Sequence, residues 1–129
     1  MQLKYTILYV KNVTQSIEFY EKAFGLERGM IHESGDYGEL KTGTTTLSFS
    51  SRRLMTELGK SPGIPDVKSP VFEIAFETND VSAALEKAKN AGATVIQDVR
   101  EEPWGQTTSY VSDKDGYLVE ICSPVGGAG

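Results

Sequence analysis

The chain has 129 residues, of which 39% are hydrophobic and 24% charged, a composition typical of a soluble globular protein rather than a disordered one. Its net charge of −5 argues against nucleic acid as a partner, because phosphate binding needs a clustered positive surface. No stretch approaches the roughly 18 apolar residues of a membrane span, so a membrane partner is not expected either.

The N-terminus and the cysteine content both bear on the cellular compartment. Residues 1–5 run directly into a strand-like pattern and lack the features of a signal peptide. Cys122 is the only cysteine, so the chain cannot form an internal disulfide, which suits a reducing environment. The sequence therefore predicts a cytoplasmic protein.

Residues 1–50 predict a first module with the order strand, helix and three strands. Apolar residues occupy both faces of the first strand, over residues 3–10. Asn12 is placed to cap a helix from Val13 to Phe24, in which apolar residues recur at helical spacing before a glycine. Turns rich in serine, glycine, threonine and aspartate separate the three strands expected next, over residues 26–33, 38–41 and 44–50.

Glycine and proline interrupt this pattern over residues 51–70, which predicts a linker with one helical turn around residues 54–58. Residues 71–124 then predict a second module. Asp80 is placed to cap its helix, which extends to about Asn90. The expected strands of this module are residues 71–78, 95–99, 107–112 and 117–122. Residues 125–129 are glycine-rich and predict a flexible tail.

The two halves form an internal repeat with one offset of 68 residues. It relates helix caps, buried helix positions and first-strand positions: Asn12 and Asp80, Val13 and Val81, Ile17 and Leu85, Tyr5 and Glu73. A repeat of this length predicts two copies of one βαβββ unit. The alternative is an ordinary α+β domain of the ferredoxin type.

Several local motifs resemble the vicinal-oxygen-chelate superfamily, which includes glyoxalase I, bleomycin-resistance proteins, fosfomycin-resistance enzymes and extradiol dioxygenases. The motifs lie at residues 9–13, 16–20, 24–26, 103–106 and 113–121. The resemblance implies an α+β fold in which two tandem βαβββ modules form an open, cup-shaped mixed sheet. It also implies a homodimer.

In metal-dependent members of that superfamily, four inward-facing side chains hold a metal. The matching positions here are Tyr5, Ser48, Glu73 and Glu120, and only Glu120 keeps an expected identity. A catalytic divalent site commonly needs three good donors, and protonated hydroxyls are poor ones. We therefore expect no cofactor, with Glu73 and Glu120 as weak candidates for a divalent metal. The only histidine, His32, lies away from these positions.

Strand alternation assigns Glu73 and Glu120 to a ligand-facing surface, because the apolar neighbours of each take the opposite face. Two carboxylates in a partly desolvated cup can serve as a proton acceptor or attract a cation. The alternative is that each is a solvated strand residue, as most glutamates are. We assign both as catalytic candidates.

The same alternation predicts a ligand-binding surface that is aromatic with a few polar groups, as is usual for small-molecule sites. Its members are Tyr5, Ile7, Tyr9, Ser48, Trp104 and Tyr110. For Trp104, a core or dimer-contact role is an equal alternative. Cys122 is expected to be a small buried residue rather than a nucleophile.

These observations favour a protein that binds a small organic molecule in the cup, without a catalytic metal, as bleomycin-resistance proteins do. A glyoxalase I-like lyase or isomerase, using Glu73 and Glu120 as metal ligands or general base, is the alternative. A ring-cleaving dioxygenase is disfavoured, because its iron needs two histidines and a carboxylate.

Overall fold

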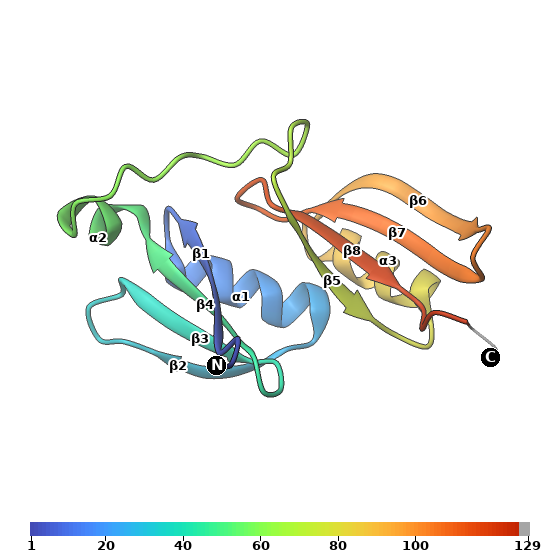
Figure 1. Cartoon of the computed structure of the whole chain (residues 1–129), viewed down its shortest axis with the longest axis horizontal. Coiled ribbons are helices and arrows are strands. Elements are labelled where there is room, and N and C mark those ends of the chain that lie inside the picture. The colour runs from blue at the N-terminus through green and yellow to red at the C-terminus, as the bar shows by residue number, and fades with distance from the viewer. Residues whose placement is uncertain (127–129) are drawn as a thin grey trace. The chain divides into compact units, whose positions relative to one another are not determined.

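A computed structural model describes residues 1–126 (Figure 1), and the chain divides into two compact units, Met1–Ile64 and Pro65–Gly129. The division falls inside the segment 51–70 that was expected to be a linker. Part of the expected tail, residues 127–129, lies outside the described residues. No helix within residues 1–126 is both long and apolar enough to cross a membrane.

The first unit is a βαβββ module followed by a short helix. Its elements are β1 (Tyr5–Val10), α1 (Val13–Phe24), β2 (Glu27–Ile31), β3 (Tyr37–Lys41), β4 (Thr46–Ser51) and α2 (Arg52–Glu57). The strands form one sheet in the order β1-β4-β3-β2, in which β1 and β4 are parallel and the other pairs antiparallel.

The second unit repeats this topology. Its elements are β5 (Glu73–Glu77), α3 (Val81–Asn90), β6 (Thr94–Glu102), β7 (Gln106–Ser112) and β8 (Leu118–Cys122). The sheet order is β5-β8-β7-β6, with β5 and β8 parallel. The prediction of an α+β fold with two tandem βαβββ modules is therefore confirmed, and the ferredoxin-type alternative is wrong.

The capping residues expected from the sequence start both long helices. The Asn12 side chain accepts a hydrogen bond from the backbone N–H of Gln15 at 2.9 Å, and Asp80 accepts one from Ala83 at 3.0 Å. Gly25 ends α1 with φ 68°, a left-handed conformation that glycine adopts without steric cost. Local chemistry thus sets where α1 begins and ends.

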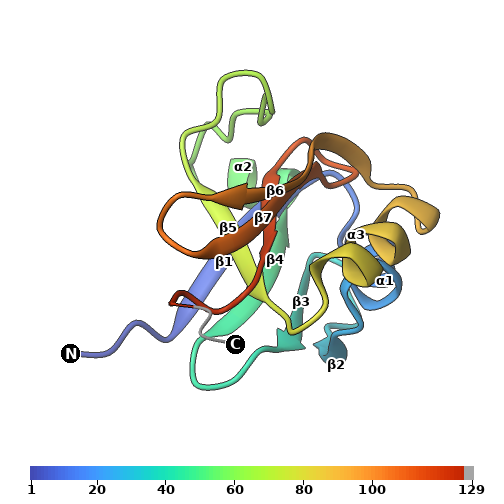
Figure 2. The same cartoon turned by 90° about the vertical axis from the view of Figure 1, so that its right-hand side faces the viewer.

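Each long helix packs against one face of its own sheet, and the other face we call the open face. In the first unit α1 contacts β2, β3 and β4, and the rings of Tyr20 and Phe49 lie 5.2 Å apart between helix and sheet. In the second unit α3 contacts β6, β7 and β8, and Figure 2 shows this helix to one side of the sheet. It buries only Val81, Leu85 and Ala88, a smaller apolar face than that of α1.

Burial alternates along β3, β5 and the second half of β1, as this arrangement requires, whereas β4 is buried at every residue from Leu47 to Ser51. Leu8, Val10, Leu47 and Phe49 lie on the α1 side and are at most 5% exposed. Val119 and Ile121 lie on the α3 side of the second sheet and are 0% and 2% exposed. Burial of side chains of this size contributes roughly 1.5–3 kcal/mol each to folding. The residues between them along each strand therefore lie on the open face.

Two elements differ from the expectation. Strand β6 extends over Thr94–Glu102, beyond the expected residues 95–99, because two register irregularities let it keep pairing with β7. Helix α2 begins at Arg52 rather than near residue 54, because the Ser51 hydroxyl accepts a hydrogen bond from Leu54 N–H at 3.0 Å and caps it.

We predict that Gly38→Ala lowers the free energy of unfolding by about 1–3 kcal/mol, because overpacking a filled core is destabilising. A Cβ on Gly38 would collide with the side chain of buried Ile17 and lie 3.1 Å from the Met30 carbonyl oxygen. Urea unfolding measures the change. Gly63→Ala is the control, since a Cβ there meets nothing within 4 Å. Equal stabilities of the two variants would contradict this packing.

Candidate functional site

The predicted catalytic residues Glu73 and Glu120 share the open face of the second sheet. Glu73 lies on β5 opposite Leu118, and Glu120 lies on β8 opposite Ala75. Val119 and Ile121, the neighbours of Glu120 along β8, are buried on the α3 side, and Ile74, which follows Glu73 on β5, pairs with Val119. The alternation inferred from the sequence therefore places both carboxylates on one surface, Glu73 exposed and Glu120 half-buried.

Tyr110 connects these two carboxylates. It lies on β7 directly opposite Glu120 in the β7–β8 register. Its phenol donates a hydrogen bond to Glu73 Oε2 at 3.2 Å and also contacts the Glu120 carboxylate. The three residues come from three strands, and we call them the Tyr110 cluster.

Burial raises the pKa of Tyr110 far above its usual value of 10.0, and the hydrogen bond and charge of Glu120, followed by those of Glu73, raise it further. The phenol consequently stays protonated at neutral pH. A single phenolic proton can be donated to only one carboxylate at a time. The Tyr110 cluster thus holds one hydrogen bond donor between two acidic acceptors.

Cys122 lies beside this cluster on β8, and its surroundings make its thiol unreactive. It is 6% exposed, and its thiol lies 3.7 Å from the Phe76 carbonyl oxygen. Burial raises the pKa of the Cys122 thiol, and the charges of Glu120 and Glu77 raise it further. A thiol that resists ionisation is a poor nucleophile, in agreement with the role expected from the sequence.

Tyr5 and Ser48 occupy the equivalent positions on the open face of the first sheet. Tyr5 pairs with Thr46 and Ile7 with Ser48, as Glu73 pairs with Leu118 and Ala75 with Glu120. Ser48 is fully buried, and its hydroxyl donates to the Thr6 carbonyl oxygen at 3.5 Å. Its hydrogen-bonding capacity is therefore directed at the protein itself.

The structure adds two residues that the sequence reasoning missed, Tyr37 and Glu39. The Tyr37 phenol donates to Glu39 Oε2 at 2.7 Å and also contacts the Ser48 hydroxyl. Burial raises the pKa of Tyr37, and the nearby Glu39 carboxylate adds to the shift. Glu39 pairs with Ser48 as Tyr110 pairs with Glu120. Alternation along β3 could have indicated Tyr37 and Glu39. The residues that alternate with them, Gly38 and Leu40, are buried on the other face of the strand.

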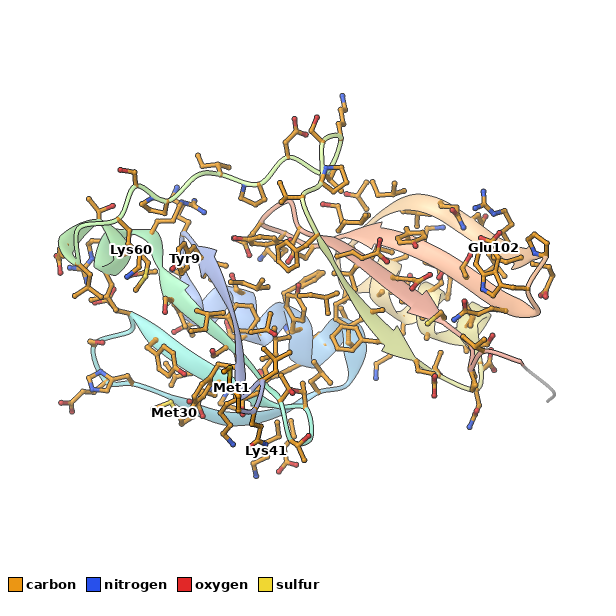
Figure 3. The ribbon with its side chains drawn as sticks, viewed as in Figure 1. Met1, Tyr9, Met30, Lys41, Lys60 and Glu102 are labelled. Carbon is orange, nitrogen blue, oxygen red and sulfur yellow. The ribbon has the colours of Figure 1, made fainter. Side chains whose placement is uncertain are left out.

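The remaining predicted ligand-binding residues stay accessible. Ile7 is 45% exposed on β1, and Tyr9 lies half-buried near the end of that strand (Figure 3). Trp104 is 57% exposed in the β6–β7 turn, and its indole N–H donates to Gln106 Oε1 at 2.7 Å. This exposure excludes the core position considered for Trp104.

His32 lies in the turn after β2, apart from the Tyr110 cluster and from the Tyr37–Glu39 pair. It is exposed, and its Nδ1 accepts a hydrogen bond from the Ser34 backbone N–H at 3.1 Å. This nitrogen thus stabilises the local turn.

The four positions that match the metal ligands of the superfamily carry two hydroxyls and two carboxylates. The first sheet offers the hydroxyls of Tyr5 and Ser48, and the second the carboxylates of Glu73 and Glu120. Within residues 1–126 no group of three or more histidine, cysteine, aspartate or glutamate residues is arranged to hold a metal ion. Catalytic sites commonly use three such donors.

Comparison with known proteins identifies the family. The pattern of the glyoxalase-like domain matches residues 3–126, nearly the whole chain. The chain belongs to the glyoxalase-like domain family. It is thereby a member of the vicinal-oxygen-chelate superfamily, as its motifs suggested.

Individual relatives of this glyoxalase-like protein are distant. A lactoylglutathione lyase from Neisseria meningitidis is 29% identical over 129 residues, covering 94% of this chain and 89% of the relative. A probable lactoylglutathione lyase from Vibrio cholerae is 27% identical over 128 residues, covering 93% and 88%.

Solved structures share the fold of this glyoxalase-like chain. A glyoxalase-related enzyme from Fulvimarina pelagi superimposes with a TM-score of 0.83 at 19% identity, covering 96% of this chain and 88% of that one. A glyoxalase/bleomycin resistance protein/dioxygenase family enzyme from Burkholderia phytofirmans gives 0.75 at 21% identity, covering 95% and 98%. At these identities the likeness establishes the fold alone.

We predict that Tyr110→Phe removes one phenol that ionises at unusually high pH. Ultraviolet titration of the folded protein measures this loss. Because the folded state raises the pKa of Tyr110, this residue stabilises the fold below about pH 10 and loses that contribution as the pH rises further. Wild-type stability should therefore fall more steeply above about pH 10 than that of Tyr110→Phe. Glu120→Gln, in which Tyr110 is kept, should lower the pH at which the Tyr110 phenol ionises. Unchanged titration curves in both variants would disprove the contact.

Proposed function

We propose that this glyoxalase-like protein binds a small organic molecule on the open faces of its sheets and does so without a catalytic metal. The observation that carries the proposal is the set of side chains at the four metal-ligand positions of the superfamily. Two of them are hydroxyls, one of which is fully buried, and only Glu73 and Glu120 are strong donors. Two carboxylates alone would hold a metal weakly.

The chemistry of the open faces supports small-molecule binding. The first presents the exposed side chains of Tyr5 and Ile7, which offer apolar and aromatic contact area. The second presents the Tyr110 cluster, whose carboxylates have no ion-pair partner within residues 1–126. A ligand on the second face would gain from a positively charged group.

A lactoylglutathione lyase-like activity is the second candidate, favoured by the relatives in Neisseria and Vibrio. In that case Glu120 or Glu73 serves as the general base, since carboxylates in partly desolvated sites take up protons effectively. Tyr110 would keep both carboxylates in position.

Metal content separates the two candidates. We expect the purified protein to contain no stoichiometric nickel, zinc, manganese or iron, and added metal to leave its melting temperature unchanged. Planar cationic compounds should raise it, and Glu73→Gln and Glu120→Gln should weaken that effect about tenfold each. Stoichiometric metal that is lost in either variant, together with metal-dependent turnover of lactoylglutathione, would establish the lyase instead.

We further propose that the protein is a homodimer. Strand β6 is the outer strand of the second sheet and exposes Val95, Ile96 and Val99, each at least 36%. Unpaired outer strands with apolar side chains are prone to associate. Sedimentation equilibrium should give twice the 14.1 kDa of one chain. Ile96→Lys should then lower the association constant, and a monomeric wild type would rule the proposal out.

A further inference from the structure

Arg52 differs from the other arginines of the chain in having no ion-pair partner within residues 1–126. The other three are all paired with carboxylates: Arg28 with Glu21, Arg53 with Asp36 and Glu57, and Arg100 with Glu102. The acidic excess of the protein makes an unpaired arginine unexpected on electrostatic grounds alone.

One terminal nitrogen of this guanidinium, Nη1, is buried and has no hydrogen-bond partner. It is the only such buried side-chain nitrogen or oxygen within residues 1–126. A buried donor without an acceptor costs folding free energy, the more so when it is charged, and such a group usually indicates a missing partner. The residue as a whole is only half-buried, so part of the side chain can be reached from solvent.

Asp36, the acid that both sequence neighbours of Arg52 contact, is already engaged. Asp36 Oδ1 accepts from the Ser51 hydroxyl at 2.7 Å, and Asp36 Oδ2 accepts from Arg53 Nη2 at 2.6 Å. The two sequence neighbours of Arg52 therefore turn to Asp36 and occupy both of its oxygens. Glu57, the acid nearest to Arg52 along the chain, pairs with Arg53, and Arg52 Nη1 is left without an acceptor within residues 1–126.

Arg52 also stands where the open face of the first sheet ends. It follows Ser50 by two residues, and Ser50 pairs with Tyr9 across β4 and β1. Helix α2, which carries Arg52, packs against both of these strands, and Tyr9 lies at this end of β1 (Figure 3). The row Tyr5, Ile7 and Tyr9 thus leads along β1 to the end of the sheet where Arg52 is placed.

We propose that Arg52 anchors the carboxylate of a small organic ligand that lies along the open face of the first sheet. A guanidinium presents a planar fork of N–H donors that matches the two oxygens of a carboxylate. The aromatic and apolar row along β1 favours an organic body over an inorganic anion. The inference rests on the proposed small-molecule function and adds the chemical class of the ligand.

The proposal makes stability and binding respond in opposite directions. Without ligand, the buried and unpaired guanidinium destabilises the folded protein. Arg52→Met should therefore melt at the same temperature as the wild type or higher. Removing a structural arginine would instead lower the melting temperature. Arg52→Lys keeps the charge but loses the fork, so it should retain only weak binding. It also provides a second variant should Arg52→Met fold poorly.

Thermal-shift titrations at constant ionic strength test the inference with a series of aromatic and aliphatic monocarboxylates that includes benzoate. Benzamide is the matched neutral probe, and inorganic phosphate is the anion without an organic body. We expect carboxylates to raise the melting temperature of the wild type and benzamide and phosphate to leave it unchanged. Arg52→Met should weaken carboxylate binding at least about tenfold.

Arg53→Met is the matched control, because the neighbouring arginine already has its partners. It should bind the carboxylates as the wild type does. Equal carboxylate binding by wild type and Arg52→Met would overturn the role of Arg52 while leaving small-molecule binding intact. A response to phosphate as strong as that to benzoate would overturn the organic carboxylate as the ligand class. If neither carboxylates nor planar cations shift the wild type, the proposed function fails as well.

Discussion

The coverage of each sheet by a single long helix is the constraint on which the rest of this protein depends. Alternate residues of a strand face opposite sides, so those beneath α1 or α3 must be apolar, while those on the open face are free to carry chemistry. Leu8 and Phe49 beneath α1, and Val119 and Ile121 beneath α3, meet the first requirement. The positions between them hold the candidate site residues.

The same scaffold carries different chemistry on its two open faces. In the first unit the equivalent positions hold Tyr5 and Ser48, and a phenol–carboxylate pair, Tyr37 and Glu39, lies beside them. In the second unit they hold Glu73 and Glu120, bridged by Tyr110. Matching registers make this a comparison of like positions, so the difference reflects side-chain identity and not backbone geometry.

Membership of the glyoxalase-like domain family accounts for the scaffold more firmly than for the chemistry. A fold supports many reactions, and the side chains at its site determine which of them is available. Here the hydroxyl of Ser48 is buried and directed at a backbone carbonyl, whereas the carboxylates of Glu73 and Glu120 share one phenol. On the proposed function, these groups would recognise a ligand by hydrogen bonds and charge.

Local chemistry allowed the sequence by itself to determine the α+β class, the tandem modules and the limits of α1. Helix caps such as Asn12 and Asp80 act within three residues, and strand alternation acts within two, so both can be read along the chain. The extent of β6 could not be predicted, because irregular pairing with β7 sets it.

The tertiary structure alone decided that Tyr110 reaches Glu73, 37 residues away, and that Tyr37 contacts Ser48. It also decided that Arg52 Nη1 is buried without an acceptor, whereas Ser51 and Arg53 on either side of it both contact Asp36. Such contacts depend on the register between strands and on competition among donors, which exist only once the chain has folded.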